Sequence, residues 1–207
     1  MNEAARAEHW QKVYTTKSEG DVSWFQEEPA ISLELINGVR PNLDSAIIDV
    51  GGGASRLVDN LLARGNRSIA VLDVSDAALI SAKARLGEAG EKVQWITADV
   101  TRWQPDRIYD IWHDRAAFHF LTEAEDREAY VARLLAALCP GGHAIIGAFA
   151  IDGPEKCSGL SVRRYDAAGL HAELGSRFAL VEARRHEHIT PWQSVQHFQF
   201  GVFQRRS

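Results

Sequence analysis

The sequence is poor in cysteine and contains no long apolar run. Its two cysteines, Cys139 and Cys157, do not form the C-x-x-C spacing of redox and metal motifs. A disulfide framework is therefore not expected, and a reducing compartment fits this composition. No apolar stretch approaches the roughly 20 residues needed to span a bilayer, and the charged segment Met1–Trp10 lacks the apolar core of a secretory signal. These absences predict a cytoplasmic globular protein.

The chain also lacks an excess of positive charge. It carries 23 lysines and arginines against 28 aspartates and glutamates, which gives a net charge of −5 at pH 7. Nucleic acids and anionic membranes require a basic face, and the three arginine pairs at 163–164, 184–185 and 205–206 are too scattered to form one. We therefore expect neither nucleic acid nor a membrane as partner. The oligomeric state is not indicated by the sequence.

Short apolar runs alternate with amphipathic helices from Ser45 onward. The expected strands are Ala46–Val50, Ser68–Val74, Lys92–Ala98, Tyr109–His113 and His143–Ala150. The expected helices are Ser55–Arg64, Asp76–Leu86, Glu123–Leu138 (stopping at Pro140-Gly141-Gly142) and a short one near Asp166–Leu174. Such alternation predicts right-handed crossovers and a parallel sheet that helices cover on both faces.

The two ends of the chain depart from this alternation. The first forty residues predict one or two helices joined by the polar segment Lys17–Asp21, with a second apolar-periodic stretch at Ile31–Val39. At the other end, Phe178–His188 and Val195–Gln204 alternate with only the turn Ile189–Ser194 between them, which predicts an antiparallel hairpin. The predicted fold class is therefore α/β: a Rossmann-like, mainly parallel seven-stranded sheet with a C-terminal antiparallel hairpin and helices on both faces.

A glycine-rich segment, Asp49-Val-Gly-Gly-Gly-Ala-Ser55, follows the first expected strand. Glycines at Gly51 and Gly53 allow a tight turn whose backbone N–H groups approach a ligand without intruding side chains. The third glycine of the dinucleotide fingerprint would stand at position 56, which is Arg56. This departure counts modestly against NAD or FAD as the ligand.

Three expected strands end in acids, namely Asp49, Asp73 and Asp99. Because ligands of parallel sheets bind at the carboxyl ends of the strands, these acids should lie along one edge of one site. Asp73 is suited to accept hydrogen bonds from both ribose hydroxyls and disfavours the 2′-phosphate of NADP. Asp99 is suited to an adenine amino group, with the N–H of Val100 beside it. Each acid alone is more often a cap or turn residue, but together they predict an adenosine ligand.

These residues resemble a known family. Ile47–Ser55, Val71–Asp73 and Ile96–Asp99 look like the first three motifs of class I S-adenosylmethionine methyltransferases. His113–Phe118 and Leu138–Gly142 are similar to the thiopurine S-methyltransferase-like branch. His9–Tyr14 and Val22–Gln26 resemble the N-terminal lid of that branch and of small lysine methyltransferases.

The resemblance implies a single methyltransferase domain over residues 1–207, with a helical lid at 1–44 and a Rossmann-like core at 45–207. It implies S-adenosyl-L-methionine as cofactor. We expect no metal, because the sequence offers no evident set of three ligands. The cofactor-binding residues that it implies are Trp24, Asp49, Gly51, Gly53, Asp73, Val74, Asp99, Val100 and Asp114.

The candidate catalytic residues are His113, Asp114 and Arg115, at the end of the fourth expected strand. Asp114 is a candidate anchor for the cofactor or a base, and Arg115 a candidate partner for a substrate carboxylate. A purely structural Asp114–Arg115 arrangement is the alternative. His119 is a second candidate base, although a packing role is more common for such a histidine.

Other segments are candidates for lining the site. Trp24 and Phe25 are expected to close over it as an apolar wall. The loop Gly153–Gly159 is expected to line the acceptor side. Within this loop, Cys157 is more simply interpreted as a packed thiol. His186 and His188 share one strand face, but no third metal ligand is evident.

The first functional hypothesis is methyl transfer to a small acceptor of thiol, selenium or similar soft-nucleophile type. The second is a protein lysine N-methyltransferase acting on a single protein target. An NAD-dependent oxidoreductase and a non-catalytic adenosine-binding module are further alternatives.

Overall fold

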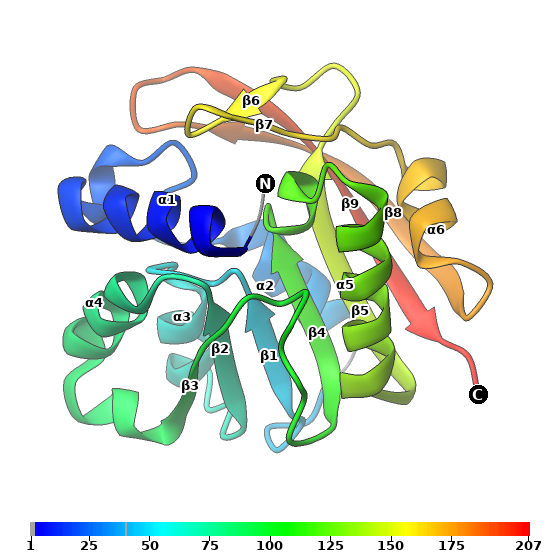
Figure 1. Cartoon of the computed structure of the whole chain (residues 1–207). Helices are drawn as coiled ribbons and strands as arrows, with labels where there is room; N and C mark the ends of the chain where they lie inside the picture. The colour runs from blue at the N-terminus through cyan, green and yellow to red at the C-terminus, as the bar shows by residue number, and fades with distance from the viewer. Residues whose placement is uncertain (1–2, 40) are drawn as a thin grey trace.

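The computed structural model describes residues 3–39 and 41–207, and its centre is one seven-stranded sheet (Figure 1). The strand order is β3-β2-β1-β4-β5-β9-β8. The strands are β1 (Ile47–Val50), β2 (Ile69–Asp73), β3 (Val93–Thr97), β4 (Tyr109–Arg115), β5 (Leu138–Phe149), β8 (Phe178–Ile189) and β9 (Val195–Arg205). The first five pair in parallel, and β9 pairs antiparallel with both β5 and β8. The predicted fold class is confirmed.

Helices cover both faces of the sheet because the short parallel strands are apolar on both sides. All residues of β1 and β2 are buried. One face packs against α5 (Ala124–Ala137) and α6 (Ala167–Leu174). The other packs against α2 (Ala30–Gly38), α3 (Leu57–Ala63) and α4 (Asp76–Leu86). Two separate apolar cores therefore hold the sheet from opposite sides.

The N-terminal segment lies across the carboxyl ends of the central strands (Figure 1). Helix α1 (Glu3–Thr16) packs against α4, and a 3-10 turn, η1 (Glu19–Asp21), leads towards α2. The two predicted N-terminal helices are thus present. The lid predicted for 1–44 includes residues 1, 2 and 40, which lie outside the described residues.

One predicted boundary is wrong. Strand β5 begins at Leu138, five residues before the predicted His143, and runs through the Pro-Gly-Gly segment. Leu138 is fully buried and pairs with Tyr109, so the chain is already extended where α5 ends. Gly141 adopts a φ of +81°, and the β4–β5 register is irregular between Tyr109 and Ile111. A small unpredicted ribbon, β6 (Lys156–Cys157) with β7 (Leu160–Ser161), stands within the loop after β5.

The hairpin packs by placing aromatic rings over glycines. Gly147 of β5 pairs with Phe200 of β9, and a Cβ atom on Gly147 would lie 2.4 Å from the Phe200 ring. Phe200 is fully buried, so its ring has little freedom to move away. The contact between β5 and β9 therefore depends on the missing side chain at position 147.

We predict that Gly147→Ala lowers the free energy of unfolding by about 1–3 kcal/mol, because an extra methyl group overpacks a closed core. Urea denaturation of the purified protein measures this change. Gly38→Ala is the matched control, since a Cβ atom at Gly38 meets nothing within 4 Å at the end of α2. Equal stability of the two variants would contradict the proposed packing role of Gly147.

Candidate functional site

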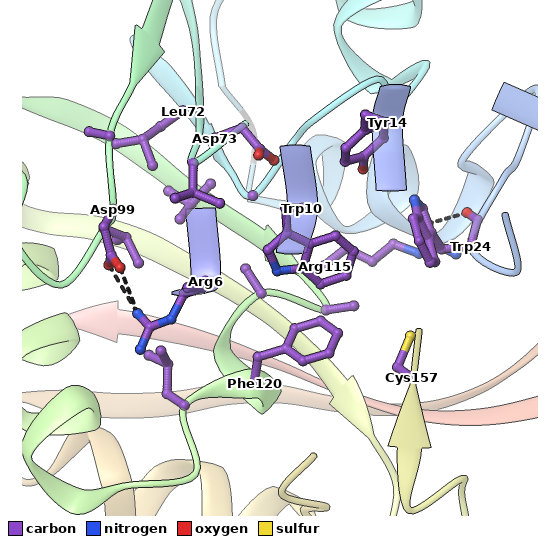
Figure 2. A pocket seen from close by; sticks show the side chains of 18 of the residues that line it. Arg6, Trp10, Tyr14, Trp24, Leu72, Asp73, Asp99, Arg115, Phe120 and Cys157 are labelled. Carbon is purple, nitrogen blue, oxygen red and sulfur yellow. Dashed lines mark hydrogen bonds and ion pairs between the residues drawn. The ribbon is translucent and has the colours of Figure 1, made fainter. Parts of the chain in front are cut away.

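An open cavity lies at the carboxyl ends of β1 to β4, beneath α1 (Figure 2). The space between its walls, counted together with the open solvent at its mouth, is about 810 Å³. The sheet order reverses between β1 and β4, and open α/β sheets bind ligands at this position. Of the predicted site residues, the cavity is lined by Trp24, Gly51, Asp73, Val74, Asp99, Val100 and Arg115.

The glycine turn after β1 brings bare backbone to the cavity. The N–H groups of Gly51 and Gly52 both donate to the Leu72 carbonyl, at 2.7 and 3.2 Å, which carries the chain across the end of β2. Gly51 has a φ of +66°, and a Cβ atom there would lie 2.5 Å from the Cβ of Ala117. Gly53 has a φ of +49°, and its Cβ would lie 2.5 Å from the Tyr14 hydroxyl. Only glycine fits both positions.

Asp73 is buried at the end of β2 and faces the cavity (Figure 2). One carboxylate oxygen accepts the N–H of Ser75 at 2.8 Å. Burial, together with the charge of Asp49, raises the pKa of Asp73 to about 7, while the backbone N–H groups of Ser75, Gly53 and Val74 act in the opposite direction. A carboxylate in this position is a strong acceptor for a ligand that brings hydroxyl donors.

Asp99, which comes after the neighbouring strand β3, is held by α1. Arg6 donates from Nη1 to both carboxylate oxygens at 3.1 and 2.8 Å, as the dashed lines in Figure 2 show. The N–H and hydroxyl of Thr101 donate to Oδ1 at 2.9 and 2.7 Å. Arg6 also contacts Asp126 of α5 at 2.5 Å. This buried ion pair ties α1 to the sheet.

His113 and Asp49 lie beside the cavity and do not line it. They are register partners on β4 and β1, and the distance from His113 Nδ1 to Asp49 Oδ1 is 2.7 Å. His113 Nε2 lies 2.9 Å from the Ser32 hydroxyl of α2. The carboxylate accepts, which places the ring hydrogen on Nδ1 and lets Nε2 accept from the serine. Both ring nitrogens are therefore engaged within the protein.

Asp114 is fully buried and shapes the turn after β4. Its carboxylate accepts the N–H of Ala117 at 2.8 Å, the N–H of Phe118 at 3.1 Å and the Tyr130 hydroxyl at 2.8 Å. Burial raises the pKa of Asp114 to about 6, and these donors oppose that rise. The turn includes Ala116 at a φ of +75° and presents Ala116 and Ala117 to the cavity. Asp114 itself does not reach the cavity lining.

Arg115 does line the cavity. Its Nη1 donates to the Trp24 carbonyl at 3.0 Å, and its guanidinium carbon lies 5.5 Å from the centre of the Phe198 ring. Nε and Nη2 are buried and have no hydrogen-bond partner among the described residues. Burial lowers the pKa of Arg115 to about 10, which leaves the side chain charged at neutral pH.

Aromatic side chains form much of the cavity wall, and of these Trp10 and Tyr14 were expected only as part of the lid segment His9–Tyr14 and not as site residues. The ring centroid of Trp10 lies 5.7 Å from that of Trp24 and 5.0 Å from that of Phe120. Arg6, Trp10 and Tyr14 are spaced by four residues, so they share one face of α1 and point into the cavity together (Figure 2). That spacing was a usable signal. Phe198 carried none, because only the hairpin's fold brings it here.

Of the remaining candidates, some line the cavity and others do not. Cys157 lines the cavity, and burial raises the pKa of its thiol to about 11. Phe25 lines a smaller neighbouring cavity instead. His119 is buried, accepts the N–H of Phe149 at 3.3 Å, and has a pKa lowered to about 3 by burial. His188 donates to the Ser23 carbonyl at 2.6 Å. Residues 3–39 and 41–207 contain no group of three metal-ligating side chains.

Comparison with known proteins identifies the segment that carries the cavity. Residues 47–142 match the family model described as a methyltransferase domain. The matched segment is similar to methyltransferase domains. It includes the glycine turn, Asp73, Asp99 and Arg115, so the domain supplies the sheet side of the cavity, and α1 supplies the opposite wall.

Two curated proteins are similar to parts of the chain. Nodulation protein S of Rhizobium tropici is 24% identical over 100 residues, covering 48% of this chain and 41% of its own length. A ubiquinone biosynthesis O-methyltransferase of Nitrosomonas europaea is 36% identical over 80 residues, covering 38% of this chain and 32% of its own length. The chain thus matches less than half the length of each relative.

A solved structure extends the likeness to the whole fold. The Burkholderia thailandensis 1,6-didemethyltoxoflavin-N1-methyltransferase, bound to 1,6-didemethyltoxoflavin and S-adenosylhomocysteine, has a TM-score of 0.72 at 18% identity. The match covers 99% of this chain and 85% of the other. The methyltransferase domain and its flanking elements therefore share the fold of class I S-adenosylmethionine-dependent methyltransferases. None of the helices in the described ranges has the length and apolar character needed to cross a bilayer.

The position of His113 separates a structural role from a catalytic one. We predict that His113→Ala lowers the free energy of unfolding by about 3 kcal/mol, because it leaves the buried Asp49 carboxylate without its partner and opens a cavity. Ser32→Ala, which removes the hydroxyl on the other side of the ring, should cost about 1 kcal/mol. Urea denaturation measures both. A His113→Ala protein of unchanged stability that had lost methyl transfer would instead show a catalytic role.

Proposed function

We propose that this chain is an S-adenosylmethionine-dependent methyltransferase that acts on a small-molecule acceptor. The observation that carries the proposal is the cavity within the methyltransferase domain, where the glycine turn and Asp73 meet at the reversal of the strand order. We include in the proposal a division into a Rossmann-like core at 45–207 and an N-terminal lid within 1–44. Helix α1 supports it because its side chains form one wall of the cavity.

The residues present fit an adenosine-containing methyl donor. A Cβ atom on Gly51 would clash with Ala117 and one on Gly53 with the Tyr14 hydroxyl, so the turn packs this closely only with glycine. Asp73 offers carboxylate oxygen to ribose hydroxyls, and Asp99 with Val100 is placed for an adenine ring. Trp10, Trp24 and Phe120 give the apolar, aromatic surroundings that favour a spread positive charge. The donor, when bound, supplies an electrophilic methyl group on a sulfonium.

The chain's own contribution is positioning and exclusion of water. Among the cavity-lining residues in the described part of the chain, none is a histidine, and Asp99 is already paired with Arg6. We propose that His113 and Asp114 position the end of β4, since both are buried and hydrogen-bonded within the protein. Holding the acceptor in line in a dry cavity then does most of the work. This favours a soft nucleophile, such as an acidic thiol or selenol, that needs no strong base.

Two relatives support a small acceptor by what they are named for. The Burkholderia thailandensis enzyme is bound to 1,6-didemethyltoxoflavin, a small molecule, and the Nitrosomonas europaea relative is an O-methyltransferase of ubiquinone biosynthesis. A protein lysine N-methyltransferase is the second candidate, favoured by the resemblance of residues 9–14 and 22–26 to the lids of such enzymes. The hairpin closure of the sheet disfavours an NAD-dependent oxidoreductase.

The deciding experiment incubates the purified full chain with radiolabelled S-adenosylmethionine and two acceptor pools, one of small thiols, selenols, phenols and amines, and one of lysine-containing proteins. The proposal expects label in the small-molecule pool only. Label in the protein pool alone would establish the lysine alternative. Binding of S-adenosylhomocysteine with no transfer to either pool would indicate a non-catalytic module. Binding of NADH instead of S-adenosylhomocysteine would indicate an oxidoreductase.

Asp73 yields a pH-dependent prediction. Its carboxylate, with a pKa raised to about 7, must be ionised to accept two ribose hydroxyls. Below pH 7 the proton has to leave on binding, so affinity for S-adenosylhomocysteine should rise as pH increases from 6 to 8 and then level off. The groups facing Asp73 are Asp49 of β1 and Tyr14 of α1. Burial raises the pKa of Tyr14 well above its ordinary value, so the tyrosine stays neutral in this range.

We therefore predict that Asp73→Asn raises the dissociation constant of S-adenosylhomocysteine about tenfold at pH 8, equivalent to about 1.4 kcal/mol, and flattens the pH dependence. Isothermal titration calorimetry at several pH values measures both effects. Asp76→Asn is the control, because Asp76 is an exposed acid three residues further along the chain. A wild-type affinity that is independent of pH, or equal weakening in both variants, would contradict the assignment.

A further inference from the structure

Arg115 brings a positive charge to the cavity. Among the described residues, no carboxylate is hydrogen-bonded to its guanidinium. Its Nη1 is bound to a backbone carbonyl, and Nε and Nη2 have no partner in residues 3–39 and 41–207. The neighbouring acids are engaged elsewhere. Asp49 pairs with His113, and Asp99 pairs with Arg6. Burial keeps the Cys157 thiol protonated at neutral pH, so that it offers no negative charge either.

Two unpartnered donors on adjacent guanidinium nitrogens form a specific recognition edge. Native proteins pair nearly all buried polar groups, so an edge left unpaired calls for an explanation. The Nε and Nη2 hydrogens of arginine are parallel and match the two oxygens of a carboxylate. The Phe198 ring lies against the guanidinium, which holds this plane in place.

This edge lies at the opposite end of the cavity from the groups suited to adenosine. Asp73 and Asp99 follow β2 and β3, whereas Arg115 follows β4 and rests on Phe198 of β9, further along the sheet in the other direction. Figure 2 shows Arg115 on the side of Trp24 and Cys157, away from Arg6 and Asp99. An acceptor beside the methyl donor would therefore meet Arg115.

We propose that the methyl acceptor is a small carboxylate with an apolar, planar body, and that Arg115 binds its carboxylate through Nε and Nη2. This inference rests on the proposed function for the identity of the neighbouring ligand. Trp10, Trp24, Phe120 and Phe198 surround the body of the acceptor. Both nitrogens are closed off from solvent, so the proposal requires the side chains around Arg115 to rearrange when the acceptor binds. Because Nε and Nη2 are already shielded from water, the carboxylate does not have to displace bound water from them.

Calorimetry with the full chain tests this, using 4-mercaptobenzoate and its neutral counterpart 4-mercaptobenzamide, each with and without saturating S-adenosylhomocysteine. We expect wild-type protein to bind the carboxylate at least tenfold more tightly than the amide. Arg115→Met should reduce this preference to less than twofold. Arg115→Lys should retain part of it, because it keeps the charge and loses the two-donor edge. Arg102→Met, which removes an exposed arginine, is the matched control and should keep the full preference.

The possible failures are distinguishable. Equal or undetectable binding of the two probes to the wild-type protein would overturn the inference and leave the proposed function intact if S-adenosylhomocysteine binds. A tenfold loss of S-adenosylhomocysteine affinity in Arg115→Met, with the probe preference unchanged, would overturn it by assigning the guanidinium to the cofactor's own carboxylate. A carboxylate preference in a protein that does not bind S-adenosylhomocysteine would support the Arg115 site and refute the proposed function. Thermal unfolding of each variant confirms that it is folded.

Discussion

The hydrogen bond between Asp49 and His113 joins the two strands between which the order of the sheet reverses. The two residues are register partners on β1 and β4, and Ser32 of α2 completes the contact from above. Without a partner, the buried carboxylate would strongly disfavour this pairing, so the bond specifies the register. The glycine turn after β1 and the alanine turn after β4 start from these strands. Every feature of the cavity therefore depends on their alignment.

The two walls of the cavity are attached to the fold in different ways. The sheet side is built from strand ends within the two apolar cores, whereas α1 is attached by Arg6, aromatic contacts and the packing on α4. The Arg6–Asp99 pair is buried, and breaking it would expose two charges to an apolar surface unless water or a ligand entered at once. On the proposed lid role of the N-terminal segment, movement of α1 and entry of a ligand would be coupled. Trp10 and Tyr14 lie on the same helix face, so they would leave the cavity together with Arg6.

The sequence was sufficient for features that depend on local pattern. The alternation of short apolar runs with amphipathic helices predicted a mainly parallel sheet, and the two alternating segments at the end of the chain predicted its closing hairpin. The glycine spacing predicted the turn that Gly51 and Gly53 form. Asp73 and Asp99 were found because strand ends are readable along one segment. The early start of β5 was missed, since the Pro-Gly-Gly segment usually ends structure and only the pairing of Leu138 with Tyr109 extends the strand.

Roles that depend on distant partners were beyond a single sequence. His113, Asp114 and Arg115 are consecutive and looked equivalent as catalytic candidates. The alternation of a strand sends His113 towards Ser32 on one face and Asp114 towards Tyr130 on the other, and Arg115 reaches the cavity from the strand end. Ser32 lies 81 residues from His113, and Tyr130 lies 16 residues from Asp114 on α5. No local signal distinguishes such contacts from a catalytic group.

The polar side chains that line the cavity bear on which acceptor the proposed reaction can use. A neutral amine or alcohol would need a base to take its proton during transfer. Asp73 is suited to the ribose, Asp99 is paired with Arg6, and the turn after β4 encloses Asp114. This agrees with the proposed acceptor, an acidic thiol or selenol that arrives already deprotonated. Arg115 acts in the same direction, because a buried cation beside the acceptor stabilises an anionic nucleophile as well as a carboxylate.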